Sequence, residues 1–285
     1  MKTKKLIAAV ALCGPLLLSN LQAQGLYLGL GVGYGFPAGK QADVEQTSTT
    51  SGSVTTNEYT TKNLSLGKGI NAGLYVGYMF NKNLGAELGI SYLIGGKTTI
   101  NDKSTGNNSS STDEYIYKGN MIRFTPALKM IIGENKLRPY MRIGMIVGIA
   151  GKLTDEYNYT NTTPGSTSSG QVITEYTGGI SLGFHGGLGI NYALSDKLSL
   201  FGELAGNYQN WAPKKSEITT YTQDGADQLP SMTTYQKETE FLDSFTTTSN
   251  SPSNNGVPDQ QTKFYLPFSS FGINIGIVLN FGGAE

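Results

Sequence analysis

Residues 26–36 have the sequence LYLGLGVGYGF, and this stretch decides the fold. Leucine, valine, tyrosine and phenylalanine occupy the even positions, whereas Tyr27 and four glycines occupy the odd ones. A strict period of two is typical of a β-strand, because successive side chains point to opposite faces. The stretch therefore predicts a strand with one apolar face and one small or polar face.

The same alternation recurs in seven further runs, and all eight are roughly ten to fourteen residues long. That is close to the length a tilted strand needs to cross a bilayer. In chain order we predict strands at residues 26–36, 70–80, 84–94, 120–132, 137–150, 179–193, 198–208 and 269–281. Pro126 and Pro139 fall inside two of them, and each lacks a donor for the strand ladder. We therefore expect local β-bulges at these prolines.

The connections between these strands alternate between short and long. Residues 81–83, 133–136 and 195–197 form short polar turns, whereas long Ser/Thr/Asn/Gly-rich stretches occupy residues 40–68, 95–118, 151–178 and 209–267. Long loops argue against a compact soluble domain but are usual on one side of a transmembrane barrel. The predicted fold is all-β: an eight-stranded antiparallel up-and-down transmembrane β-barrel with short periplasmic turns and four long extracellular loops. We expect some strands to continue outward as hairpins, around residues 114–118 and 154–159.

Aromatic residues near the strand ends indicate which face meets lipid. On the apolar face, one row lies toward the loops and another toward the turns, formed by Tyr34, Phe36, Tyr92 and Tyr208, and by Tyr78, Phe80, Tyr192 and Phe281. Two such rows resemble the aromatic girdles of membrane barrels. The alternative is a soluble lipocalin-like barrel or sandwich, which would turn the apolar face inward and place the glycines on its surface.

The N-terminal residues predict export. Lys2, Lys4 and Lys5 precede a short apolar run and a small residue, Ala23, at a plausible cleavage site. This order is typical of a secretory signal peptide. We assign residues 1–23 to the signal peptide and residues 24–285 to an outer-membrane β-barrel domain of a Gram-negative envelope. The single cysteine, Cys13, lies in the part to be removed, so no disulfide is expected.

Composition excludes several classes of function. The net charge is zero, which gives no broad attraction to nucleic acid. The 38 glycines, 17 tyrosines and mildly hydrophilic mean hydropathy exclude a helical membrane protein. The chain has a single histidine and no ligand cluster at useful spacing, so neither a metal nor a cofactor is expected.

The last predicted strand carries the most specific resemblance. Residues 271–281, FGINIGIVLNF, look like the terminal strand that the barrel-assembly machinery recognises, and the whole pattern resembles the OmpA-like transmembrane domain of porin-family proteins. Residues 282–285 follow the terminal Phe281 and depart from that pattern. The resemblance implies an outer-membrane location, contact with lipid and lipopolysaccharide, and insertion by the assembly machinery. We expect no peptidoglycan-binding domain after the barrel.

Charged residues on the polar faces form the candidate site. The set is Glu87, Arg123, Lys129, Arg138, Arg142, His185 and Glu203. From the strand directions we predict ion pairs of Glu87 with Lys129 or Arg138, and of Glu203 with Arg142. These pairs would satisfy charges inside the barrel, where an unpaired charge is costly. The family resemblance also implies a gate in which acid and base exchange partners, and four basic residues against two acidic ones would favour anions.

Three classes of function remain. An enzyme acting on lipid A would need a base beside a serine, but Ser181 and His185 lie four residues apart on one strand face, too far for contact. The long loops contain aromatic residues suited to binding an unidentified extracellular ligand: Trp211, Tyr221, Tyr235, Phe241 and Phe245. The sequence favours a non-enzymatic integral outer-membrane protein with a structural or surface-interaction role. The alternatives are a narrow, weakly anion-preferring pore and, less favoured, a lipid A-modifying enzyme.

Overall fold

The computed structural model describes residues 25–38, 41–246 and 256–281. The predicted signal peptide and residues 282–285 lie outside the described residues. The described residues contain seventeen strands in one hydrogen-bonded system, with a short 3₁₀ turn, η1 (Leu229–Ser231), and one helical turn, α2 (Thr234–Lys237). Among them, no helix is both long enough and apolar enough to cross a membrane.

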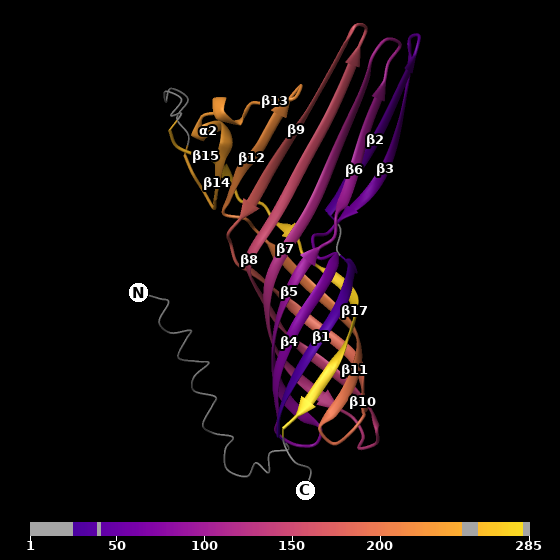
Figure 1. Ribbon diagram of the computed structural model, residues 1–285, viewed down its shortest axis with the longest axis vertical. Coiled ribbons are helices and arrows are strands. Elements are labelled where there is room, and N and C mark those ends of the chain that lie inside the picture. The colour runs from indigo at the N-terminus through magenta and orange to yellow at the C-terminus, as the bar shows by residue number, and fades with distance from the viewer. Residues whose placement is uncertain (1–24, 39–40, 247–255, 282–285) are drawn as a thin grey trace.

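Eight of the strands pair into a closed ring (Figure 1). In ring order they are β1 (Gly25–Pro37), β4 (Gly69–Met79), β5 (Leu84–Gly95), β7 (Ser110–Ile131), β8 (Leu137–Thr163), β10 (Ser181–Ala193), β11 (Leu198–Trp211) and β17 (Ser270–Asn280). Each pairs antiparallel with the next, and β17 pairs back with β1. Every predicted strand is present, and β7 and β8 extend well beyond their predicted bounds.

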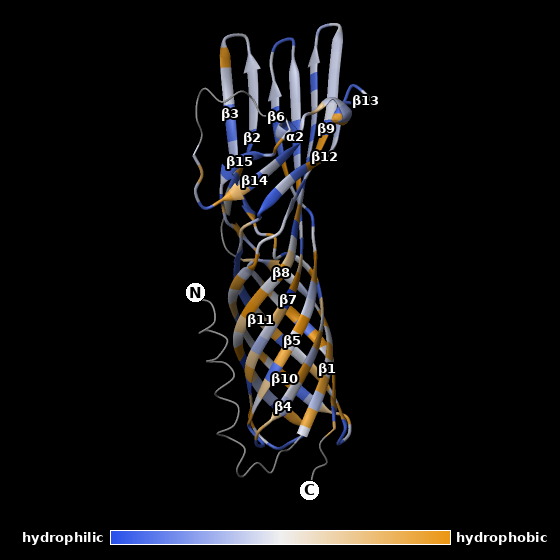
Figure 2. Ribbon diagram, turned by 90° about the vertical axis from the view of Figure 1, so that its left-hand side faces the viewer, coloured by the Kyte–Doolittle hydropathy of each residue, from blue (hydrophilic) through white to orange (hydrophobic). Residues whose placement is uncertain are grey.

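The apolar face of the ring points outward. Tyr27 of β1 is 3% exposed inside the ring, whereas its neighbour Leu26 is 49% exposed outside it. The same division holds around the ring, and Figure 2 shows hydrophobic residues concentrated on the ring and hydrophilic ones above it. Tyr34, Tyr92 and Tyr78 of the predicted aromatic rows are among the exposed outer residues. This orientation is the opposite of a soluble barrel with an apolar interior.

The prediction of bulges at the two prolines is wrong. Pairing of β7 with β8 skips Pro126 but resumes at Ala127 opposite Gly144 in an unchanged register, so no residue is inserted. Pro139 lies near the beginning of β8, and its carbonyl accepts a hydrogen bond from the Ile132 amide at 2.8 Å. A missing donor near the beginning of a strand costs little, so Pro139 requires no bulge, and at Pro126 the β7–β8 ladder omits a rung without a change of register.

The bulge lies higher, between Asn120 and Ile122 of β7. Asn120 pairs with Lys152 and Ile122 with Ile149, so two residues of β8, Ala150 and Gly151, oppose one of β7. A Cβ atom at Gly151 would lie 2.5 Å from the indole nitrogen of Trp211, so only glycine allows this packing. The bulge marks the level where the ring ends.

Ala150 has a φ of +50°, in the left-handed region, and its side chain is exposed. Because left-handed backbone is costly for residues with a Cβ atom, Ala150→Gly is expected to raise the free energy of unfolding by about 1 kcal/mol. Ala150→Val is expected to lower it. Urea titration of the refolded protein in detergent measures both, and a loss of stability in the glycine variant would contradict this account.

Above the ring, the strands form a tall sheet that we call the platform (Figure 1). It consists of the upper parts of β7 and β8 together with β2 (Gln41–Ser51), β3 (Val54–Leu64), β6 (Thr98–Thr105), β9 (Ser166–Thr177), β12 (Lys215–Gln223), β14 (Glu238–Leu242) and β15 (Asp259–Thr262). The two-residue strands β13 (Ala226–Asp227) and β16 (Leu266–Pro267) pair with β12 and β11. The spatial order is β3-β2-β6-β7-β8-β9-β12-β14-β15, in which β2–β6 and β14–β15 are parallel.

The long connections at residues 40–68, 95–118 and 151–178 are therefore mostly strands and not loops, whereas residues 209–267 are strand only in part. The expected hairpins around residues 114–118 and 154–159 are confirmed, and they continue to Ser110 on β7 and Thr163 on β8. Serine- and threonine-rich composition is typical of loops, but threonine is β-branched and favours strands. The strands of these segments join one continuous hydrogen-bonded sheet.

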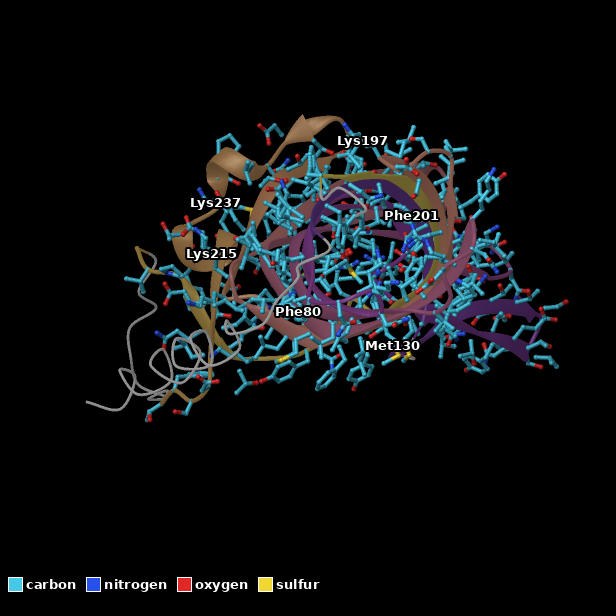
Figure 3. The ribbon with its side chains drawn as sticks, turned by 90° about the horizontal axis from the view of Figure 1, so that it is seen from below. Phe80, Met130, Lys197, Phe201, Lys215 and Lys237 are labelled. Atoms are coloured by element: carbon cyan, nitrogen blue, oxygen red, sulfur yellow. The ribbon has the colours of Figure 1, made fainter. Side chains whose placement is uncertain are left out.

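Two buried clusters close the ring at its ends. We call the upper one the roof, formed by Leu64, Leu66, Leu93, Met121, Leu153, Trp211, Leu266 and Phe268. The lower one, near the short turns, is the floor, formed by Tyr27, Met79, Ile131, Tyr140, Phe201 and Val278. Seen from below, side chains including Phe201 fill the interior (Figure 3). The polar residues of the interior lie between these clusters.

Candidate functional site

The interior holds a compact group of four charges that we call the lumen cluster. Arg142 of β8 lies between the carboxylates of Glu87 on β5 and Glu203 on β11. Its Nη1 is 2.5 Å from Glu87 Oε1, its Nε donates to Glu203 Oε2 at 2.6 Å, and its Nη2 also pairs with Glu203. Lys129 Nζ is 3.6 Å from Glu87 Oε2. The cluster thus contains two positive and two negative charges.

The strand register explains why these four charges meet. Lys129 of β7 lies directly opposite Arg142 of β8, and two cations side by side repel each other. Glu87 contacts both cations and offsets that repulsion. All four side chains are at most 5% exposed, and charges buried to this degree require partners of opposite sign.

Tyrosines and an asparagine complete the cluster. Tyr27 donates a hydrogen bond to Glu87 at 2.8 Å, and Tyr140 and Asn274 donate to Glu203 at 3.0 and 3.1 Å. Lys129 Nζ lies 4.7 Å from the ring centres of Tyr27 and Tyr140, and the Arg142 guanidinium 4.7 Å from that of Tyr75. These aromatic residues were not predicted as site residues, although strand parity placed Tyr27 and Tyr75 on the inner face.

The structure separates the other two arginines from the cluster. Arg123 is buried near the roof, and its Nη2 donates to the Phe268 carbonyl at 3.0 Å. Of the two partners predicted for Glu87, Lys129 is the one that meets it, and Arg142 is added to that pair, whereas Arg138 lies near the short turns. Four residues of extended strand separate Arg138 from Arg142, or about 13 Å. Neither Arg123 nor Arg138 forms an ion pair with a described residue.

His185 lies inside the ring with a local polar partner. Its Nδ1 is 2.8 Å from Asn207 Oδ1, and the two residues face each other on β10 and β11. Ser181 instead donates to the Asn210 carbonyl at 2.6 Å. The structure therefore does not bring Ser181 and His185 together as a nucleophile and base. Within the described residues, no group of three histidine, cysteine or acidic side chains is arranged to hold a metal ion.

The space left between these side chains is small. A cavity of about 30 Å³ adjoins His185 and Arg142, one of about 20 Å³ lies above it, and one of about 10 Å³ lies beside Lys129. An eight-stranded barrel is just wide enough for side chains to fill its interior. The roof above and the floor below pack against both ends of this region, and the three cavities around the charged side chains are each about 30 Å³ or smaller.

The platform holds a second group of candidate residues. Tyr115 of β7 stacks on Tyr157 of β8 with ring centres 4.8 Å apart, and Tyr157 stacks on Tyr159 at 5.7 Å. The hydroxyl of Tyr157 donates to Asp113 at 2.6 Å. Asp155 lies opposite Tyr117, and its buried Oδ1 has no hydrogen-bond partner among the described residues.

Burial raises the pKa of Asp155 from its ordinary 3.8 to about 6. The folded protein therefore binds this proton more tightly than the unfolded chain, so the free energy of unfolding falls as the pH rises from about 4 to about 6. Asp155→Asn stays neutral and is expected to be about 1–2 kcal/mol more stable than the wild type at pH 8, and equally stable at pH 3.5. Urea titration followed by fluorescence of Trp211, the sole tryptophan, tests this. Glu156→Gln, on the opposite face, is the matched control, and an Asp155→Asn advantage independent of pH would contradict the assignment.

Comparison with known proteins now identifies the family. The family model described as "Outer membrane protein beta-barrel domain" matches residues 7–222, most of the chain. The chain belongs to the outer membrane protein beta-barrel domain family. It is therefore an integral outer-membrane protein with a β-barrel domain. The match ends on β12, and β17, which closes the ring against β1, follows later in the chain. No curated protein matches the sequence.

Proposed function

We propose that this protein is a non-enzymatic, eight-stranded transmembrane barrel whose closed interior anchors the platform outside the cell, where the platform binds a partner. The short turns face the periplasm and the platform faces outward. Residues 1–23 act as the signal peptide, the assembly machinery inserts the barrel, and lipid and lipopolysaccharide surround its apolar wall.

The observation that carries this proposal is the continuity of β7 and β8. They are 22 and 27 residues long, whereas a strand that only crosses a membrane needs about ten. At about 3.3 Å per residue, β8 extends roughly 90 Å from the turn end to the top of the platform. Strands that pass unbroken from barrel to platform hold it at a fixed height and orientation.

Two features favour a closed anchor over the alternative of an anion-preferring pore. The lumen cluster pairs its charges internally, and the three cavities beside it measure only about 30, 20 and 10 Å³. For the refolded protein in planar bilayers we therefore expect no discrete conductance steps. Steps that favour anions and change with Glu203→Ala would instead support the pore.

Cell adhesion tests the binding role. In one variant, an Asn-Gly turn replaces residues 159–170, and it joins Asn158 and Gln171, which already face each other across the hairpin. Cells displaying the wild type should adhere to at least one surface coated with a basic polypeptide, an acidic polypeptide or a neutral glycan. Cells displaying equal amounts of the folded variant, which lacks the upper part of the β8–β9 hairpin, should adhere more weakly. Equal adhesion of the two, or no adhesion by the wild type, would contradict the proposal.

A further inference from the structure

The register of the platform sorts its tyrosines onto one face. Tyr115 faces Tyr157 across β7 and β8, Tyr157 faces Val172 on β9, and Val172 faces Tyr221 on β12. Residues paired in this way share a face, and every second residue along a strand joins them, except across the irregularity between Ile218 and Thr220 of β12. The same reasoning through β6, β2 and β3 shows that all tyrosines of these platform strands share one face, which we call the tyrosine face: Tyr59, Tyr115, Tyr117, Tyr157, Tyr159, Tyr176 and Tyr221.

The lysines are divided between the two faces as sharply as the tyrosines are. The tyrosine face carries Asp102, Asp113 and Asp155, and among the described side chains of β2, β3, β6, β9, β12 and upper β7 and β8 it has no lysine or arginine. The lysines of these strands lie on the opposite face: Lys62, Lys103, Lys118, Lys152 and Lys215. There, Lys62 pairs with Glu45 at 2.9 Å and Lys152 with Glu175 at 2.7 Å. Negative charge on the tyrosine face has no such compensation.

Two aspartates of the tyrosine face lie where they repel each other in the unbound protein. Asp102 and Asp113 lie directly opposite each other on β6 and β7, and like charges in that position repel. One oxygen of each accepts a hydrogen bond, Asp102 from the Gln46 amide at 2.7 Å and Asp113 from Tyr157. These donors are neutral, so the negative charge remains beside the stacked rings.

The base of the tyrosine face is covered by the protein's own chain, whereas its upper part is open. Beyond β12 the sheet curls, so that Phe241 of β14 and Phe264 pack against Tyr176 with ring centres 6.0 Å away. Higher up, Tyr115 and Tyr157 are half-buried, and Tyr59 is 64% exposed. An elongated segment laid along the strands has access to the rings and to Asp102 and Asp113 together.

We propose that the tyrosine face binds a cationic, lysine- or arginine-rich segment of a partner polypeptide. Ammonium and guanidinium groups are attracted to the faces of tyrosine rings and pair with carboxylates, so one ligand chemistry satisfies both features of the surface. A neutral glycan would also stack on tyrosines but would leave the carboxylates unpaired. This inference rests on the proposed function, because it requires that the platform be exposed outside the membrane.

Fluorescence anisotropy of the refolded full chain in non-ionic detergent tests this proposal. The probes are a labelled nine-residue lysine–arginine peptide, the same peptide with glutamine at every basic position, and a labelled neutral oligosaccharide. We expect binding of the basic peptide only, weakening as salt is added. The variant Asp102→Asn/Asp113→Asn, which keeps both hydrogen-bond acceptors, should bind it about tenfold more weakly.

The matched control removes the same amount of negative charge from the opposite face of the platform. Glu114→Gln/Glu156→Gln removes two carboxylates from the adjacent strands β7 and β8 and should leave affinity within about twofold. Tyr157→Ala/Tyr159→Ala should weaken binding while the net charge is unchanged. Equal losses in the two charge variants, no loss in either, or binding of the oligosaccharide alone would overturn the inference. Adhesion of displayed cells to another coating would still support the proposed function.

Discussion

Arg142→Met is expected to lower the free energy of unfolding by about 3–5 kcal/mol. The substitution removes the cation that contacts both Glu87 and Glu203 and leaves Glu203 without an ionic partner among the described residues. Because Glu203 is fully buried, water cannot replace the lost partner. Urea titration of the refolded protein, followed by Trp211 fluorescence and by the mobility of the folded form on gels, measures the loss.

Two further variants separate loss of the ion pairs from loss of packing. Arg138→Met removes an arginine from the same strand face that has no ion pair among the described residues, so its effect should be below about 1 kcal/mol. Adding Glu203→Gln to Arg142→Met removes the carboxylate left unpaired, while Glu87 keeps its pair with Lys129, and should recover a large part of the stability. If the double variant is no more stable than the single one, packing and not charge explains the effect.

Trp211→Ala is expected to cost about 3–5 kcal/mol, because it removes the largest fully buried side chain of the roof. The indole lies edge-on to Phe268 at 5.6 Å and donates to the Gly178 carbonyl at 2.8 Å, at the level where the ring meets the platform. Removal of the indole should destabilise the platform before it destabilises the ring. Limited proteolysis should cut the variant above the ring, while the barrel keeps its folded mobility on gels.

Tyr59→Ala is the control for this prediction. It also removes an aromatic side chain, but Tyr59 is largely exposed on the platform, so stability and proteolysis should change little. If Trp211→Ala unfolds barrel and platform together at one urea concentration, the roof belongs to a single cooperative unit and does not act as a separable joint.

The ring strands could be predicted because each carries its own signal. In β1 every second residue is large and apolar, and this pattern specifies both the strand and the face that meets lipid. The platform lacks this signal, because water bathes both of its faces and neither must be uniformly apolar. β9, with the sequence STSSGQVITEYT, therefore resembles a loop in composition although it is a strand throughout.

The sequence predicts which residues form the candidate site better than it predicts how those residues are arranged. Strand parity places Glu87, Lys129, Arg142 and Glu203 inside the ring, but relative heights depend on the register of neighbouring strands, which single-strand patterns do not specify. An uncertainty of a few residues decides whether Glu87 meets Arg138 or Arg142. The bulge at Ala150 was also hidden, because it depends on space for Trp211, whose position only the fold defines.

The unbroken passage of β7 and β8 from barrel to platform also has a mechanical consequence. When a bound partner pulls the platform away from the membrane, the force runs along these strands, and the hydrogen bonds between them lie across it. The many rungs of the ladder then share the load in shear and are not opened one after another. Such a stalk resists tension along its length, because many hydrogen bonds must break together before the two strands separate.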